Sequence, residues 1–221
     1  MKDRADITVR KAKSSDIPFL ITSIIEADKS GTNKSSYCSL LNITETELSD
    51  LLRKVFELEL DGFEFCVSSF CVLEYKNELV GALASWIEYE NGIPSWQNRM
   101  LSIREEANPD SFSHLLKMNE TSANLIPERT HFSLQIESLY IIPEFRGMGL
   151  FKLMLDFHYE NSIIHFKNLH SIELIVYDNN VAALNSYSKL GFNIIKKTKL
   201  NNQVINSIFP SNGMFLISKS I

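Results

Sequence analysis

The chain lacks a long hydrophobic run. No apolar stretch in its 221 residues approaches the length of about eighteen that would span a bilayer. The opening residues, Met1-Lys2-Asp3-Arg4, also lack the apolar core of a secretory signal peptide. These two absences predict a cytoplasmic protein with no membrane partner.

Cysteine is scarce, and its three copies are an odd number, which fits a reduced environment. Cys66 and Cys71 are five positions apart, so on one strand they would face opposite sides and could not form a disulfide. His158 and His165 are one heptad apart on an expected helix, but no third ligand is spaced to join them. We therefore expect no bound metal and two solvated or core-edge histidines.

The chain has no excess of positive charge. Its formal net charge of −5 argues against nucleic acid as a partner, because contact with phosphates requires a basic surface. With 44% hydrophobic and 22% charged residues, the composition is typical of a globular protein. We expect a single domain over residues 1–221, with an insertion at about 91–130.

The hydrophobic pattern predicts a mixture of strands and helices. Apolar runs predict strands at 7–13, 65–75, 79–89, 132–141, 172–177, 192–197 and 214–218. Caps and apolar stripes predict helices at about 17–28, 45–60, 150–166 and 181–190. Loops are expected at 30–39 and 198–213, and two short helices, 100–107 and 112–118, within the insertion.

The turn Arg146-Gly147-Met148-Gly149 joins an expected strand to an expected helix. Several backbone N–H groups then point at one spot beside the positive end of the helix dipole. The turn predicts a site for an anion such as a pyrophosphate; the alternative is a tight turn that binds nothing. The Lys-Ser/Thr pair of a P-loop and the third glycine of a dinucleotide fingerprint are missing, because Leu150, Phe151 and Lys152 follow.

A second motif follows the next expected strand, from Asn180, which can cap a helix, to Gly191 and Phe192. With the turn, it resembles the GNAT superfamily of acyl-CoA-dependent N-acyltransferases. The family's Arg/Gln-x-x-Gly-x-Gly/Ala motif maps onto 146–151, and its Asn-x-x-Ala-x-x-x-Tyr-x-x-x-Gly-Phe motif maps onto 180–192. The order of the earlier elements is similar too. Phe151 departs from the family's Gly or Ala, so its ring must turn away into the helix packing and reshape the phosphate contact.

The resemblance implies an α/β fold. It predicts a mixed sheet of about seven strands, with helices on both faces and a splayed parallel pair of central strands. The strand–helix–strand unit at 132–177 should form that pair through a right-handed crossover.

The resemblance also implies acetyl-CoA as co-substrate. In this family the backbone N–H of Ile141 would lie near the thioester carbonyl, and Asn180 near the pantetheine arm. The implied cofactor-binding residues are Leu139, Ile141, Arg146, Gly147, Met148, Gly149, Leu150, Phe151 and Asn180.

Two side chains are candidates for proton transfer. Glu137 lies four residues before Ile141, which predicts the same strand face, and partial burial would raise its pKa toward that of a useful base. The alternatives are an ion pair with a neighbouring strand's cation, or deprotonation of the amine through ordered water. Tyr187 is the candidate acid for the departing thiolate; the alternative is a core aromatic packed by Leu184 and Leu190.

The sequence therefore predicts an N-acetyltransferase that acts by direct transfer in a ternary complex, because neither motif contains a cysteine. The acceptor would be a primary amine on a small molecule or a peptide. The alternative is a non-catalytic acyl-CoA-binding sensor or interaction module. Trp86, Glu88 and Glu90 either face the acceptor or face solvent. The insertion at 91–130 either lines the acceptor pocket, or pads the fold or forms a homodimer contact.

Overall fold

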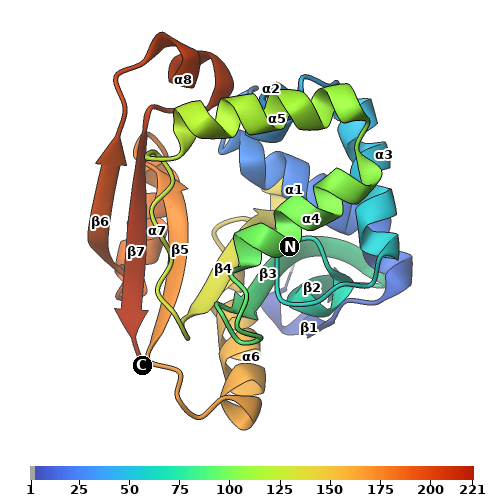
Figure 1. Cartoon of the computed structure of the whole chain (residues 1–221). Coiled ribbons are helices and arrows are strands. Elements are labelled where there is room, and N and C mark those ends of the chain that lie inside the picture. Colours follow the sequence, from blue (N-terminus) through green and yellow to red (C-terminus); the bar gives the residue numbers. More distant parts are fainter. Residues whose placement is uncertain (1–2) are drawn as a thin grey trace.

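Seven strands form one sheet in the computed structural model, which describes residues 3–221 (Figure 1). The strand order is β1-β2-β3-β4-β5-β7-β6, and among these neighbours only β4 and β5 run parallel. The strands are β1 (Ile7–Lys11), β2 (Phe70–Tyr75), β3 (Glu78–Ile87), β4 (Leu134–Ile141), β5 (Ser171–Tyr177), β6 (Asn193–Lys199) and β7 (Gly213–Ser220). The predicted seven-stranded mixed sheet is confirmed.

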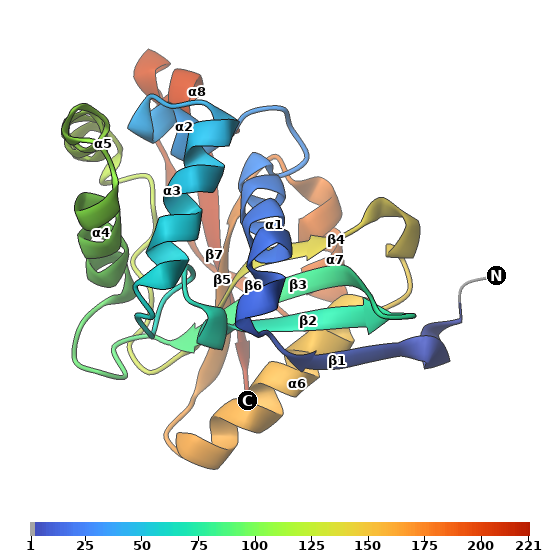
Figure 2. The same ribbon diagram turned by 90° about the vertical axis from the view of Figure 1, so that its right-hand side faces the viewer.

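Helices cover both faces of this sheet, as predicted. Figure 2 shows α1 and α3 on one side and α6 on the other. In chain order the helices are α1 (Ile17–Lys29), α2 (Ser36–Leu41), α3 (Glu45–Glu57), α4 (Ser95–Glu106), α5 (Pro109–Ser122), α6 (Leu150–His165), α7 (Val181–Lys189) and α8 (Gln203–Ile208). The apolar residues of α1, α2, α3 and α8 share one core, and those of α6 and α7 pack in a second core on the opposite face. No helix within residues 3–221 is long and apolar enough to cross a membrane.

The two central strands splay apart. β4 and β5 pair only at Leu134↔Ile172 and Gln135↔Glu173, so within the described residues the rest of β4 has no ladder partner on its β5 side. The predicted splayed parallel pair is therefore confirmed. Backbone N–H and C=O groups along this gap are left for another partner, because an extended edge exposes its donors and acceptors.

A β-bulge interrupts β4 on its other edge. The register with β3 shifts between Ala82 and Ala84, and Ser138 adopts a left-handed φ of 53°. The extra residue reverses the alternation of side chains. Glu137 therefore lies on the α1 side, whereas the Ile141 side chain packs in the core beneath α6. The prediction that Glu137 and Ile141 share one face is wrong, because it assumed an uninterrupted strand.

Several predicted boundaries also differ. The expected loops at 30–39 and 198–213 contain α2 and α8, each opened by a side-chain cap from Ser35 and Asn202. These helices have six residues each, too short to show a helical period. The second strand begins at Phe70 because a 3-10 turn precedes it, so Cys66 lies outside the strand that holds Cys71. All three cysteines are free.

The insertion folds as α4 and α5, both longer than predicted. α4 packs against α3, and α5 packs against α2 and α8. Both helices belong to the core on the α1 side of the sheet, and Figure 2 shows them at the left of the view, beside α3. The insertion thus extends the helical layer on this face.

Candidate active site

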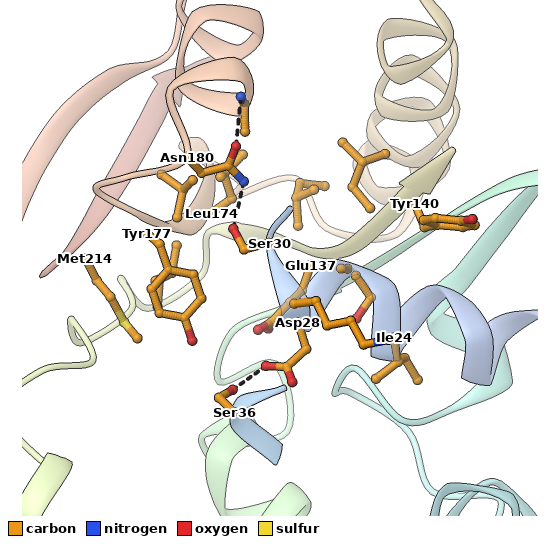
Figure 3. Close-up of a pocket in the computed structure, with 18 of the residues that line it drawn as sticks. Ile24, Asp28, Ser30, Ser36, Glu137, Tyr140, Leu174, Tyr177, Asn180 and Met214 are labelled. Atoms are coloured by element: carbon orange, nitrogen blue, oxygen red, sulfur yellow. Dashed lines mark hydrogen bonds between the residues drawn. The ribbon is translucent and has the colours of Figure 1, made fainter. Parts of the chain in front are cut away.

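A cavity of about 1410 Å³ runs along the splay. Its walls come from the end of α1, β4, the turn before α6, the start of α7 and the insertion. Figure 3 shows Asp28, Glu137 and Tyr177 around one part of this space and Asn180 at its side. The cavity is thus lined by residues of both sequence motifs and by residues of α1 and the insertion, which neither motif includes.

The turn before α6 is open to the cavity. Gly147 and Gly149 have φ values of 78° and 71°, in the left-handed region that glycine adopts without strain. Among residues 3–221, apart from the chain neighbours, no atom lies within 4 Å of a Cβ placed on Gly147, and one placed on Gly149 meets only the guanidinium of Arg4, at 3.3 Å. Because Gly149 also caps α6, the first N–H groups of this helix face the turn. This geometry suits an anion, as the sequence predicted.

Arg146 has a structural contact of its own. Its Nε donates to the carbonyl oxygen of Ile141 at 2.8 Å, and its guanidinium lies 6.0 Å from the centre of the Tyr140 ring. The side chain therefore ties the turn to the end of β4. We infer that Arg146 shapes the turn through these contacts and offers an anion its backbone amide.

Phe151 and Tyr187 form an edge-to-face pair. The Phe151 side chain is buried in the α6 core, so the ring turns into the helix packing as the sequence predicted. It contacts the Tyr187 ring at a centroid distance of 5.3 Å, and Phe192 lies at 6.1 Å on another side. Burial raises the pKa of Tyr187 to about 12, which keeps the phenol protonated at neutral pH. Tyr187 is thus a packed ring that carries a protonated phenol and lines the cavity.

Asn180 joins two walls of the cavity. Its Oδ1 accepts from the backbone N–H of Ala183 at 3.2 Å and so caps α7. Its Nδ2 donates to Ser30 Oγ, at the end of α1, over 2.7 Å (Figure 3). The side chain holds the start of α7 close to α1, where both line the cavity.

Glu137 projects into the cavity and is ion-paired. Its Oε2 accepts from Arg129 Nη2 at 2.6 Å. The sequence left open a pair with a cation of a neighbouring strand; the partner comes from the insertion instead. Burial raises the pKa of the Glu137 carboxyl, Glu64 raises it further, and Arg129 and Arg99 act in the opposite direction. The proton affinity of the Glu137 carboxyl group therefore depends on these charges.

Sequence reasoning missed the polar groups of the remaining wall. Asp28 accepts from Ser35 Oγ at 2.6 Å, from Ser36 Oγ and from the Tyr37 N–H, and burial raises its pKa. Tyr37 donates weakly, at 3.5 Å, to Glu64, which forms a buried ion pair with Arg99. These residues come from α1, α2, the segment before β2 and α4. No local pattern links such distant positions.

Residues of the insertion line the cavity; that this part of the cavity receives the acceptor stays a prediction. The lining residues of the insertion are Pro94, Ser95, Trp96, Arg99, Met100, Ile103, Leu115, Asn119, Ser122, Ala123, Ile126, Pro127, Glu128 and Arg129. Of the three residues proposed at the end of β3, Glu88 also lines it. Trp86 lies instead beneath the Arg129 guanidinium, and Glu90 is exposed outside the cavity.

The two histidines of α6 serve no common site. His158 is buried; its Nδ1 lies 2.6 Å from Ser85 Oγ and its Nε2 2.9 Å from the carbonyl oxygen of Leu83. Burial lowers its pKa to about 4, so this ring is neutral at pH 7. His165 is exposed. Residues 3–221 hold no cluster of three or more His, Cys, Asp or Glu side chains arranged for a metal.

A cavity along splayed parallel strands, with a glycine turn at a helix N-terminus, is the site geometry that the resemblance implied. The chain belongs to the acetyltransferase (GNAT) family, whose model matches residues 39–192. No curated protein sequence matches the chain.

Solved structures share the fold at low sequence identity. An N-acetyltransferase from Staphylococcus aureus Mu50 is 16% identical with a TM-score of 0.65, covering 96% of this chain and 100% of its own. An agmatine N-acetyltransferase S171A mutant in its apo form is 13% identical with a TM-score of 0.58, covering 98% and 100%. Arabidopsis thaliana Naa50, in complex with the bisubstrate analogue CoA-Ac-MVNAL, is 14% identical with a TM-score of 0.51, covering 98% and 99%.

Proposed function

We propose that the protein transfers an acetyl group from acetyl-CoA to a primary amine, directly and within a ternary complex. One observation carries this proposal: a single cavity joins the glycine turn, the gap between β4 and β5, Tyr187 and Glu137. The amine and the thioester can therefore meet without a carrier residue. None of the residues lining this cavity is a cysteine, which favours direct transfer over an acyl-enzyme.

Backbone groups would hold the co-substrate. The N–H groups of the turn and of the first residues of α6 suit its pyrophosphate, and the residues involved are Arg146, Gly147, Met148, Gly149, Leu150 and Phe151. The unpaired edge of β4, at Leu139 and Ile141, suits the amides of the pantetheine arm and the thioester oxygen. Asn180 stands beside that path at the start of α7. When bound, acetyl-CoA supplies the activated acyl group.

Glu137 would accept the proton of the acceptor ammonium. Its carboxylate lies on the cavity wall beside the insertion, and burial makes it a stronger base than an exposed glutamate. The proton passes to Oε1 or Oε2 directly or through one water. The neutral amine can then attack the thioester carbon.

Tyr187 would protonate the thiolate that leaves as the C–S bond breaks, and the second proton lost by the amine nitrogen as the amide forms would restore the phenol. The raised pKa of Tyr187 keeps the proton on the phenol until negative charge develops on sulfur. The ring is fixed by Phe151 and Phe192, so the hydroxyl needs little reorganisation at the moment of transfer.

Release of free thiol from acetyl-CoA across a panel of amines tests the proposal. Because similar structures include an agmatine N-acetyltransferase and a spermidine N-acetyltransferase chimera, the panel should hold agmatine, spermidine, simple monoamines and short peptides. We expect amine-dependent thiol release with at least one acceptor class. Binding of acetyl-CoA with no thiol release from any amine would instead favour the sensor module.

The same assay tests the base. Glu137→Gln keeps the size of the side chain but cannot take up a proton, so the acid limb of the pH–rate profile should change. An unchanged limb together with an unchanged rate would move the base elsewhere, or to solvent.

A further inference from the structure

The last residues of the insertion bring an arginine against β4. Arg129 Nη2 donates to Glu137 Oε2 at 2.6 Å, and Nη1 donates to Gln135 Oε1 on the same strand. The guanidinium also lies 5.1 Å from the centre of the Trp86 ring on β3. Only 13% of the Arg129 side chain is exposed. One planar group is thus held from three directions.

Each of these supports is itself fixed. Gln135 is buried, and its Nε2 donates to Ser133 Oγ at 2.5 Å and to Glu173 Oε2 at 3.2 Å. The backbone N–H of Thr130, next to the arginine, donates to Glu173 Oε2 at 3.1 Å. The chain therefore anchors Arg129 through its backbone as well as its side chain.

The beginning of the insertion is tied to the same place. Trp86 Nε1 donates to Glu88 Oε2 at 3.0 Å. Glu88 in turn accepts from the N–H of Ser95 at 3.0 Å and from its Oγ at 2.7 Å, where α4 begins. Both ends of the insertion thus converge on the strand residues that surround Glu137.

Glu137 needs such a support. The bulge at Ser138 turns it away from the face that carries Ile141 and toward the cavity. A glutamate side chain there has several rotamers. The planar Arg129 fork restricts them, because one nitrogen binds Glu137 while the other binds the buried Gln135. The ion pair also opposes the effect of burial, which favours the neutral acid.

We propose that Arg129 is a positioning residue, which keeps the Glu137 carboxylate ionised and aimed into the cavity for the acceptor amine. This inference rests on the proposed role of Glu137 as the base. The insertion then has a function, because it supplies the cation that keeps Glu137 ionised near neutral pH.

Other charged groups surround Glu137 and also influence its protonation. The charged and titratable groups facing it from the neighbouring elements are Asp28, Tyr37, Glu64, Arg99, Arg129 and Tyr177. Glu64 and Arg99 pair with each other and act in opposite directions on Glu137. Arg129 is the cation that touches the carboxylate, so its removal should dominate any change.

The test is the pH dependence of kcat/KM for the acceptor in Arg129→Met and Arg129→Lys. Loss of a contacting cation should shift the acid limb of Arg129→Met upward by about one to three pH units. Arg129→Lys keeps the charge but loses the fork, so its limb should move less while kcat falls. The KM for acetyl-CoA should stay unchanged in both. Arg104→Met, an exposed site on α4, is the matched control and should leave the limb in place.

Repeating the Arg129→Met substitution in the Glu137→Gln variant distinguishes a positioning role of Arg129 from a general effect on the structure. In Glu137→Gln the base is absent, so adding Arg129→Met should cost almost nothing more. The proposal is overturned if the acid limb stays in place in both Arg129 variants. It is also overturned if Arg129→Met lowers kcat/KM in the Glu137→Gln background as much as it does in the unmodified protein. Removing one partner of a buried ion pair can weaken a fold, and the lysine variant keeps the test valid if the methionine variant does not fold. Failure of the proposed function is distinct, because the unmodified protein would then release no thiol with any amine.

Discussion

Replacement of Tyr187 by phenylalanine removes one hydroxyl group and little else. The ring contacts with Phe151 and Phe192, at 5.3 and 6.1 Å, are kept by a phenylalanine. Among the described residues, no hydrogen bond from the Tyr187 hydroxyl accompanies these contacts. The free energy of unfolding at pH 7 should therefore change by no more than about 0.5 kcal/mol.

The same change should slow turnover strongly. A positioned general acid contributes about 10²–10⁴-fold, or about 3–5 kcal/mol of transition-state stabilisation. The loss should appear in kcat, with the KM for acetyl-CoA almost unchanged, because the hydroxyl acts mainly in the transition state.

Alkaline stability provides an independent readout. The pKa of Tyr187 is raised to about 12 because burial disfavours the phenolate. Its contribution to stability is therefore complete below pH 10 and is lost as the pH rises toward 12. In Tyr187→Phe, the free energy of unfolding should therefore decrease less between pH 10 and pH 12 than in the unmodified protein.

Thiol release under saturating substrate and urea unfolding at pH 7 and pH 11 measure these effects. Leu184→Met, at a neighbouring apolar position of α7, is the matched control for packing and should keep normal turnover. Near-normal turnover in Tyr187→Phe would refute the acid role and leave Tyr187 as a packed aromatic.

Three further changes test other parts of the structure. Gly149→Asp should abolish acetyl-CoA binding in calorimetry, because it places a carboxylate at the proposed pyrophosphate site; unaltered affinity would place the co-substrate elsewhere. Gly81→Ala should lower the free energy of unfolding by about 1–3 kcal/mol, and the melting temperature with it, because the new Cβ would lie 3.1 Å from the Tyr140 carbonyl oxygen. His158, with a pKa of about 4, binds fewer protons folded than unfolded, so stability should fall by about 2 kcal/mol from pH 7 to pH 5. His158→Gln should reduce that fall and exposed His165→Gln should not; equal falls in both variants would contradict the assignment.

The sequence alone predicted the strands, the two motif helices and the glycine turn from local signals: runs of apolar residues, glycines between a strand and a helix, and caps such as Asn180. The splayed parallel pair was implied by the resemblance to the GNAT superfamily, and anion binding at the turn stays a prediction. The burial of Phe151 was also predicted, and it fits the free energy that an apolar ring gains by leaving water for the core. The roles of the individual site residues remain predictions.

One missed feature did leave a trace in the sequence. Along β4, Leu134 and Ile136 occupy even positions, whereas Leu139 and Ile141 occupy odd ones. All four belong to the α6-side core, so the change of parity marks the bulge at Ser138. Attention to that shift would have placed Glu137 on the opposite face from Ile141.

Only the tertiary structure decided what surrounds Glu137. The number of residues between Arg99 and Glu64, or between Asp28 and the strands, carries no signal. Arg99 meets Glu64 because α4 packs against α3, and Asp28 reaches the cavity because α1 packs on β4. Ion pairs of this kind depend on distances of a few ångströms between separate elements, and hydrophobic periodicity contains no information about such distances. Local patterns thus determined the frame of this acetyltransferase, while the packing of its insertion decided the electrostatics of its cavity.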